Sequence, residues 1–283
     1  MNSSTRRGFL GTISVAAAGL LPARPAQATP ESAAGGMDDA CILTPLAEEG
    51  PFYFDPKLVR SDIAEDKTGV PLTLRLRVIE AGPCTAISGA RVDIWHCDAQ
   101  GLYSAFRGQG DRHAIDTTSK TFLRGTQMTD TAGSVEFKTI YPGWYDGRTT
   151  HIHFKVFLDQ RTVLIGQTFL PDALNEFIYN NVPAYEGRAR QRGVLNANDH
   201  VVEQADPDHR AFCAVKEEKE RYVASLTLGV DHRAQAEASN FRGPPPGPPP
   251  GPPPGGFAGG GPMPGRLVRD RLTALVPGLK RTP

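Results

Sequence analysis

Hydrophobic and polar residues alternate with a period of two along several short stretches in the middle of the chain. The clearest stretch is residues 70–79, where Leu72, Leu74 and Leu76 are separated by polar side chains. Successive side chains of a β-strand point to opposite faces, so this alternation predicts a strand with one buried face. Similar patterns occur at residues 90–96, 134–139, 151–158 and 222–230, and a mainly apolar run at 163–170 predicts a more buried strand.

Turn signals separate the predicted strands. At each of these signals glycine follows a small residue, proline or aspartate. They lie at residues 88–89, 131–133, 142–143 and 146–147. Short strands with frequent turns are typical of a β-sandwich or barrel. The chain is therefore predicted to be all-β, with an antiparallel β-sandwich core over residues 41–231 and long loops.

Residues 172–213 interrupt this pattern. The segment 171–178 predicts one or two helical turns, whereas Pro183, Gly187 and Gly193 indicate loop around them. A long excursion from a compact β domain is often a lid or an interface segment.

The composition changes after residue 231. Residues 232–265 are rich in proline and glycine, and within them Gly-Pro-Pro-Pro repeats with a period of four. Collagen needs glycine at every third position, so the repeat predicts a disordered polyproline II spacer instead. In residues 266–283, leucine and valine recur near helical spacing among basic residues. This basic amphipathic tail is expected to contact a membrane surface or a partner, with a solvated tail as the alternative.

The first 28 residues resemble a twin-arginine export signal. They contain Arg-Arg-Gly-Phe-Leu at 6–10, an apolar run at 12–21 and Ala-x-Ala at 26–28. A disordered basic N-terminus is the alternative. Residues 29–40 are predicted to be a flexible segment, and the protein is expected in the periplasm or outside the cell.

Charge and cysteine content narrow the functional classes. The formal net charge is zero, which gives no argument for nucleic-acid binding, and the body of the chain has no apolar run long enough to span a membrane. Cys41, Cys84, Cys97 and Cys213 permit two disulfides in three pairings. Cys84 and Cys97 flank a predicted strand and are a plausible pair. The sequence contains no Cys-x-x-Cys spacing, the pattern that would indicate a thiolate zinc site.

The strongest chemical signal is the histidine pair His151 and His153. On a strand both side chains project from one face, and two imidazoles on one face are half of a metal site. Tyr145 offers a phenolate close by, and Tyr103, which follows the turn after another predicted strand, offers a second one. Phenolate is a hard anionic ligand that favours iron(III) over zinc or copper.

Taken together, these segments resemble the intradiol ring-cleavage dioxygenases, the family of catechol 1,2-dioxygenase and protocatechuate 3,4-dioxygenase. The resemblance spans residues 44–230, nearly all of the predicted domain. It is carried by Thr-Pro at 44–45, Glu-Gly-Pro-Phe-Tyr at 49–53, Trp-His at 95–96, Gly-x-Tyr at 101–103, Pro-Gly-x-Tyr at 142–145 and His-x-His at 151–153. Each segment alone is weakly specific, whereas all of them in this order are specific.

The resemblance implies a non-haem Fe(III) cofactor bound by Tyr103, Tyr145, His151 and His153. It also implies that a catechol-type substrate and O2 react to give a muconate-type diacid, with both oxygen atoms inserted. Tyr145 is expected to be displaced from the metal and to accept a substrate proton as a general base.

Further roles follow from matching the same motifs. Arg148 and Gln167 fall on positions that lie near the substrate in the family and stabilise anionic intermediates. Tyr53 and Trp144 are candidate residues of the substrate pocket. His96 is expected to make structural hydrogen bonds and not to bind the metal.

Two features differ from the well-known members of the family. The helical dimerisation region of catechol 1,2-dioxygenases is not expected here, and the short link from Tyr145 to His151 predicts a more open site that accepts varied catechols. The alternatives are a non-catalytic exported β-sandwich binding module and a copper or zinc enzyme using the same His-x-His. Whether the protein forms a homo-oligomer is left open.

Overall fold

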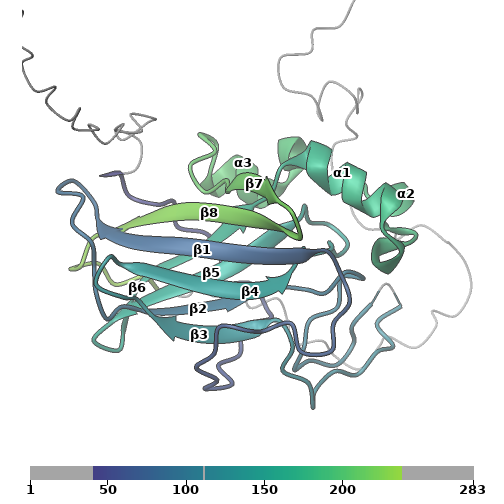
Figure 1. Ribbon diagram of the computed structural model, residues 1–283, viewed down its shortest axis with the longest axis horizontal. Helices are drawn as coiled ribbons and strands as arrows, with labels where there is room; N and C mark the ends of the chain where they lie inside the picture. Colours follow the sequence, from purple (N-terminus) through teal and green to yellow (C-terminus); the bar gives the residue numbers. More distant parts are fainter. Residues whose placement is uncertain (1–40, 111, 238–283) are drawn as a thin grey trace, which may run out of the picture. The chain divides into compact units, whose positions relative to one another are not determined.

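The computed structural model describes residues 41–110 and 112–237. Two four-stranded sheets form stacked layers (Figure 1), with strand orders β4-β1-β8-β7 and β3-β2-β5-β6. The predicted all-β sandwich is therefore confirmed. The strands are β1 Pro71–Glu80, β2 Arg91–Trp95, β3 Arg124–Met128, β4 Ser134–Ile140, β5 His151–Leu158, β6 Arg161–Phe169, β7 Ala214–Glu218 and β8 Arg221–Val230.

Most neighbouring strands run antiparallel, but β1 and β8 run parallel, with Leu72 beside Tyr222. The predicted antiparallel arrangement is wrong for this one pair. It joins strands from the beginning and the end of the domain, so no hairpin turn dictates their relative direction. Strands β3 and β7 were also not predicted, because Arg-Gly-Thr-Gln-Met and Ala-Val-Lys-Glu-Glu show no clear alternation of apolar and polar residues.

The alternation in β1 places its leucines in the core between the sheets. Leu72, Leu74 and Leu76 are buried there, while Arg75 and Arg77 are exposed on the opposite face. This is the half-buried strand that the sequence predicts.

Strand β5 differs because both of its faces are buried. Ile152 lies in the core between the sheets, so His151 and His153 project from the outer face of their sheet. On that outer face Trp95 of β2 and Gln167 of β6 are the ladder neighbours of His153. The sheet thus presents a row of functional side chains away from the main core.

The segment after β6 contains more helix than predicted. Its helices are short and contain few apolar residues, so they leave little periodic signal in the sequence. Ile178, Tyr179 and Tyr185 from this segment are buried in the main core, so it packs against the sandwich. Figure 1 shows α1 and α2 together at one end of the sheets. Its elements are α1 Asp172–Asn181, η2 Pro183–Tyr185, α2 Arg188–Gln191, η3 Asn196–Asn198 and α3 His200–Ala205.

A disulfide joins Cys41 to Cys84, with their Cα atoms 5.1 Å apart. Cys97 and Cys213 are buried and free, so the predicted pairing of Cys84 with Cys97 is wrong. The backbone explains the observed pair, because Gly82 in the turn after β1 donates a hydrogen bond of 2.7 Å to the Cys41 carbonyl. Spacing along the chain does not reveal this long-range approach.

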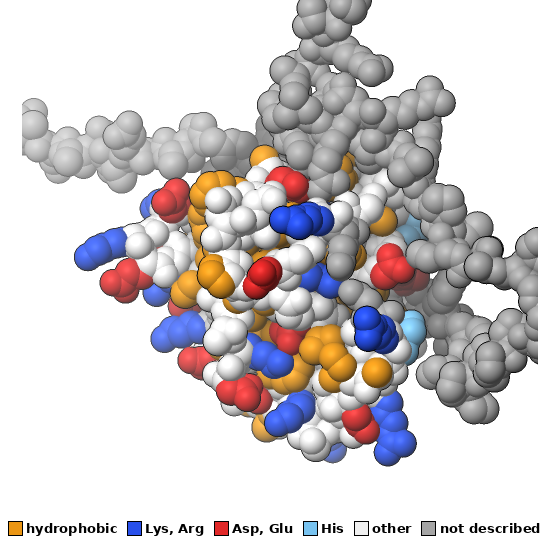
Figure 2. Space-filling model, turned by 90° about the vertical axis from the view of Figure 1, so that its right-hand side faces the viewer, with side chains coloured by type: hydrophobic (Ala, Val, Ile, Leu, Met, Phe, Trp, Pro, Cys, Tyr) orange, Lys and Arg blue, Asp and Glu red, His pale blue; other side chains and the backbone are white. Residues whose placement is uncertain are grey.

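Figure 2 shows one face of the described chain, on which basic and acidic side chains are interspersed. Within the described ranges, no helix is both long and apolar enough to cross a membrane. The predicted export signal (1–28), the flexible segment (29–40), the linker beyond residue 237 and the basic tail (266–283) lie outside the described residues and stay predictions.

Candidate metal centre and active site

The two histidines of β5 converge on one point. Their Nε2 atoms lie 3.0 Å apart, and both side chains are buried. The Nδ1 atom of His151 lies 2.7 Å from the Thr149 carbonyl oxygen, which can only accept, so Nδ1 carries the proton and Nε2 keeps its lone pair. His153 Nδ1 has no hydrogen-bond partner among the described residues. The hydrogen bond that orients the His151 ring, from Nδ1 to a backbone carbonyl, is typical of a metal-ligating histidine.

The tyrosines lie against the same two histidines. Tyr103 is fully buried, and its hydroxyl lies 3.4 Å from His151 Nε2. The Tyr145 ring lies 5.5 Å from the Tyr103 ring and 5.5 Å from the His151 ring, centroid to centroid. The four ligands predicted from the sequence therefore come together, although 50 residues separate the first from the last.

Burial sets the protonation states of these groups. It lowers the pKa of His151 to about 3, with help from the nearby Arg148 charge, and lowers the pKa of His153 well below its ordinary value. It raises the pKa of Tyr103 well above its ordinary value and that of Tyr145 to about 12, although Arg148 partly offsets the latter. Without a cation, both imidazoles and both phenols are neutral.

These donors fit a ferric ion. Neutral imidazoles are the form that binds metal, and His151 Nε2, which keeps its lone pair, lies 3.0 Å from His153 Nε2 and 3.4 Å from the Tyr103 hydroxyl. A highly charged metal ion lowers the pKa of a bound hydroxyl and would convert the phenols to phenolates. Two phenolates and two imidazoles form a hard, mixed oxygen and nitrogen set that suits iron(III).

The wall behind His153 is tightly packed. Trp95 stacks on the imidazole with ring centroids 4.8 Å apart and planes 9° from parallel. On another side Gly50, at φ +70°, approaches so closely that a Cβ there would lie 3.3 Å from His153 Cε1. The neighbouring His96 is not part of this cluster. Its ring nitrogens lie 2.8 Å from the Cys97 carbonyl and 2.8 Å from Thr139 Oγ1, which confirms its predicted structural role.

The loop after β2 holds Tyr103 through its backbone. Tyr103 N–H donates to the Gln109 side-chain oxygen at 2.9 Å, and the Thr117 hydroxyl donates to the Tyr103 carbonyl at 2.6 Å. Gly101, at φ +85°, lies against the backbone at Trp144, where a Cβ would come within 2.2 Å of the carbonyl oxygen. This close approach joins the loops that carry the two tyrosines.

Arg148 and Gln167 also lie at the site, as predicted. Arg148 is buried, and its Nη2 donates to the Gln167 side-chain oxygen at 2.5 Å. Gln167 in turn donates to the Glu48 carbonyl at 2.9 Å. A buried carboxylate that the sequence did not single out, Asp199, accepts from Arg148 Nε at 2.9 Å. The cation beside Tyr145 is thus held on two sides.

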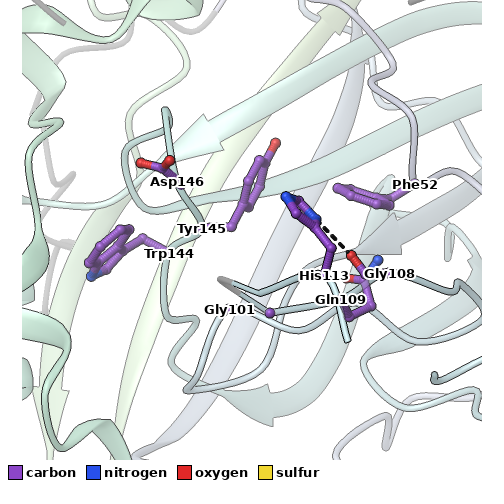
Figure 3. A pocket seen from close by; sticks show the side chains of 9 residues that line it. Phe52, Gly101, Gly108, Gln109, His113, Trp144, Tyr145 and Asp146 are labelled. Carbon is purple, nitrogen blue, oxygen red and sulfur yellow. Dashed lines mark hydrogen bonds between the residues drawn. The ribbon is translucent and has the colours of Figure 1, made fainter. Parts of the chain in front are cut away.

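A cavity of about 320 Å³ opens beside Tyr145. Tyr145 is the one predicted ligand that is not fully buried, so it is the ligand that faces this cavity. Figure 3 shows His113 among the residues that line this cavity, and the Phe52 and Tyr145 rings meet edge to face with centroids 5.8 Å apart. The Nδ1 atom of His113 donates to the Gly108 carbonyl at 3.0 Å, which leaves Nε2 as an acceptor in the neutral ring. The Phe52 ring also stacks on Tyr103 at 4.4 Å.

The two candidate pocket residues occupy different places. Trp144 lines the cavity, but its indole N–H donates to the Arg188 carbonyl at 3.1 Å. Tyr53 is not among the lining residues of this cavity. Its hydroxyl donates to Asp93 at 2.9 Å, and its ring packs on Trp95, 4.8 Å away. A substrate contact by Tyr53 stays a prediction, whereas the adjacent Phe52 lies at the cavity.

Sequence reasoning missed three contributors to the site. Phe52 stands within the Glu-Gly-Pro-Phe-Tyr segment that carried the resemblance, so attention to its apolar ring could have found it. Asp199 precedes His-Val-Val in a pattern typical of a helix N-cap, which predicts a helix start but not a pairing with Arg148. His113 lies in a polar loop and gave no signal.

Two buried imidazoles and two phenols meet on the outer face of a sandwich sheet, beside a small cavity, and define a β-sandwich protein with a candidate histidine–tyrosine metal site. The family model described as Dioxygenase matches residues 47–210, more than half of the chain. The chain therefore belongs to the intradiol ring-cleavage dioxygenase family.

Relatives and solved structures agree with this assignment. The chain is 29% identical over 201 residues to catechol 1,2-dioxygenase from Acinetobacter baylyi, covering 62% of this chain and 59% of the relative. It is 27% identical over 157 residues to chlorocatechol 1,2-dioxygenase from Rhodococcus opacus, covering 44% and 56%. The chain thus spans less than two thirds of these curated relatives. The intradiol ring-cleavage dioxygenase from Tetranychus urticae superposes with a TM-score of 0.63 and 29% identity, covering 70% of this chain and 98% of that one.

Proposed function

We propose that this protein is a non-haem Fe(III) intradiol dioxygenase that inserts both atoms of O2 into a catechol-type ring and yields a muconate-type diacid. Tyr103, Tyr145, His151 and His153 would hold the iron. The observation that carries the proposal is the pair of imidazole Nε2 atoms, 3.0 Å apart, in a buried site walled by two phenols. The similarity to catechol 1,2-dioxygenase supports the same class of reaction.

When bound, the ferric ion supplies the Lewis acidity that activates a catechol. The protein supplies orientation and proton transfer. The bond from His151 Nδ1 to the Thr149 carbonyl fixes that ring with Nε2 toward the metal position. Tyr145 borders the cavity, so its phenolate oxygen is the ligand atom best placed to take up a proton from an incoming catechol hydroxyl.

Arg148 is the proposed electrostatic partner of the reaction. Its charge acts on the Tyr145 phenol and lowers the pKa of that group against the larger effect of burial. A buried guanidinium loses little of its field to solvent screening, so it would also stabilise negative charge that develops on a bound catechol. Gln167 fixes one edge of this guanidinium through its side-chain oxygen.

The cavity limits the size of the substrate. A volume of about 320 Å³ lies at the lower end of ordinary ligand pockets, which suits a single aromatic ring with a small substituent. The two phenols favour this ferric chemistry over a copper or zinc enzyme. A purely structural binding module has no need for two imidazoles and two phenols that converge on one point.

The decisive experiment combines spectroscopy and product analysis on the purified full-length protein. Iron-loaded protein should be red-brown through tyrosinate-to-iron charge transfer, and O2 added after anaerobic titration with catechols should give muconate-type diacids. The Tyr145→Phe variant should shift or bleach the colour and lose most of the activity. A colourless protein with stoichiometric iron, or a Tyr145→Phe spectrum identical to that of the wild type, would refute the proposed ligand set.

We also propose export to an oxidising compartment. The Cys41–Cys84 disulfide supports this, since stable disulfides are rare in the reducing cytosol. Cell fractionation should find the mature protein outside the cytoplasm, and replacing the arginine pair at 6–7 with lysines should retain it inside. Export of the substituted protein at the wild-type level would contradict a twin-arginine route.

A further inference from the structure

The carboxylate of Asp199 is the most completely buried charge at the site and has no role in the proposed function. It is 0% exposed, and it comes from the helical segment after β6, 51 residues beyond Arg148. An isolated buried carboxylate is costly, so its position requires strong partners. Those partners are the Arg148 guanidinium and several backbone N–H groups.

The contact with Arg148 involves one edge of the guanidinium. Arg148 Nε donates to Asp199 Oδ2 at 2.9 Å, and Nη2 lies 3.4 Å from Oδ1. Nη2 also donates to the Gln167 side-chain oxygen at 2.5 Å. With Nε and Nη2 engaged in this way, the orientation of the planar group about its long axis is fixed. That orientation decides which N–H groups remain for Tyr145 and for a bound substrate.

Asp199 also accepts hydrogen bonds from the backbone next to the predicted metal ligands. Its Oδ2 accepts from the Thr149 backbone N–H at 2.8 Å, two residues before His151. Its Oδ1 accepts from Val201 N at 2.9 Å and from Val202 N at 3.2 Å, which makes it the N-cap of α3. One side chain therefore connects the helical segment to the entry of the ligand-bearing strand.

We propose that Asp199 is a positioning residue of the active site, which holds the Arg148 guanidinium in the orientation that faces Tyr145 and the substrate. This inference rests on the proposed function, because it concerns the residue that stabilises anionic intermediates in that reaction. Among the described residues, no hydrogen bond links Asp199 to the side chain of a predicted metal ligand, and Asp199 does not line the cavity, so it acts through Arg148.

A matched control stands in the same segment. Asp206 is also buried, and its carboxylate accepts from the Arg210 and Ala211 backbone N–H groups at 2.7 and 2.9 Å. In the part of the chain that the structure describes, no side chain donates to it. Asp206→Asn should therefore reproduce the loss of a buried carboxylate that accepts hydrogen bonds from backbone N–H groups, without disturbing Arg148. Asp199→Asn keeps the cap oxygen, but the new amide N–H groups cannot accept from the guanidinium.

The first measurement uses the iron-free protein, labelled with 15N-arginine, so it does not depend on catalysis. The Arg148 Nε–H resonance, assigned by its absence from an Arg148→Lys variant, should be protected from exchange in the wild type. It should shift and lose protection in Asp199→Asn and stay unchanged in Asp206→Asn. If Asp199→Asn folds poorly, Asp199→Ser replaces it, since serine is an equally good N-cap.

The second measurement compares iron-loaded proteins. Asp199→Asn should bind iron at the wild-type stoichiometry, shift the tyrosinate charge-transfer band and lower kcat by about tenfold to a hundredfold, as expected for a displaced catalytic group. KM should change less than kcat. Asp206→Asn should keep both the band and kcat, whatever it loses in thermal stability.

The outcomes separate this inference from the proposed function. An active wild type with an equally active Asp199→Asn variant overturns the role of Asp199 and leaves the dioxygenase intact. An unchanged Arg148 Nε–H resonance in Asp199→Asn overturns it as well, and so does an equal loss of kcat in Asp206→Asn. A wild type that binds iron but cleaves no catechol overturns the proposed function itself.

Discussion

The site has a strand half and a loop half, and the two are built on different principles. The strand half consists of His151, His153 and Gln167, which lie on neighbouring strands and share one sheet face. The loop half consists of Tyr103 and Tyr145, in the segments after β2 and β4, together with the cavity residues Phe52 and His113. Ladder hydrogen bonds position the first half, whereas long-range contacts position the second.

The difference also appears in burial. His151, His153 and Gln167 are almost fully buried, while Tyr145 is partly exposed and His113 is exposed at the cavity. A rigid, dry strand half suits metal binding, which requires ligand geometry to be kept within a narrow range. In the loop half Tyr103 is fully buried, and the accessible part at Tyr145 and His113 suits substrate entry and variation between relatives. We therefore expect changes in the strand half to abolish the chemistry and changes at the cavity to alter the choice of substrate.

The largest effect should follow the loss of a strand ligand. His153→Ala removes one of the two imidazoles whose Nε2 atoms lie 3.0 Å apart, so iron content should fall close to zero and ring cleavage below detection. Metal analysis and oxygen uptake measure both. His96→Ala is the control, because it removes a buried histidine with two hydrogen bonds that does not face the site. That variant should lose about 1–3 kcal/mol of stability for the groups left unpaired and still bind iron. Full iron content in His153→Ala would contradict the assignment.

Local pattern predicted the strand half well, because strand geometry is local. The His-x-His spacing alone required His151 and His153 to share a face, and the fold keeps them there. The pairing of β5 with β6 then placed Gln167 beside His153, which no single-strand pattern could predict. Asp199 was out of reach for the same reason, since its contact with Arg148 depends on how the helical segment packs.

The loop half was predicted only through resemblance to a family. Nothing in the spacing of Tyr103 and Tyr145 requires them to meet, because 42 residues separate them and both lie outside regular strands. Their meeting depends on Gly101 reaching the backbone of Trp144 and on side chains such as Gln109 that hold the loop. His113 could not be predicted, since its position follows from the path of that loop.

The second-largest effect should follow a substitution at Gly101. It tests whether the close approach of Gly101 to Trp144 brings the two tyrosine loops together. Gly101 and Gly82 share φ +85°, but a Cβ at Gly101 would lie 2.2 Å from the Trp144 carbonyl oxygen, whereas one at Gly82 would meet nothing within 4 Å. Gly82→Ala should cost about 1 kcal/mol for the left-handed backbone alone. Gly101→Ala should cost about 3 kcal/mol, because a backbone atom must move as well.

Thermal unfolding would resolve this difference, since about 1 kcal/mol shifts Tm by roughly 2–4 °C in a domain of this size. Gly101→Ala should also bind less iron, because Tyr103 lies two residues away, while Gly82→Ala should bind it normally. Equal losses of stability in the two variants would mean that the approach of Gly101 to Trp144 does not hold the loops together.

The smallest and most selective effect should come from the cavity. The His113 Nδ1 proton is donated to the Gly108 carbonyl, so its Nε2 can accept from a hydroxyl substituent on a catechol ring. His113→Ala should lower kcat/KM for hydroxyl-bearing catechols by about 2- to 12-fold, the value of one neutral hydrogen bond at about 0.5–1.5 kcal/mol. Unsubstituted catechol has no group for this contact, so its kcat/KM, like the iron content, should stay at the wild-type level. Arg112→Ala changes an exposed residue next to His113 that does not line the cavity, and it should leave the ratio of the two substrates unchanged. Equal losses of kcat/KM for both substrates in His113→Ala would mean that His113 only stabilises its loop. The loop half would then contribute shape but no selectivity.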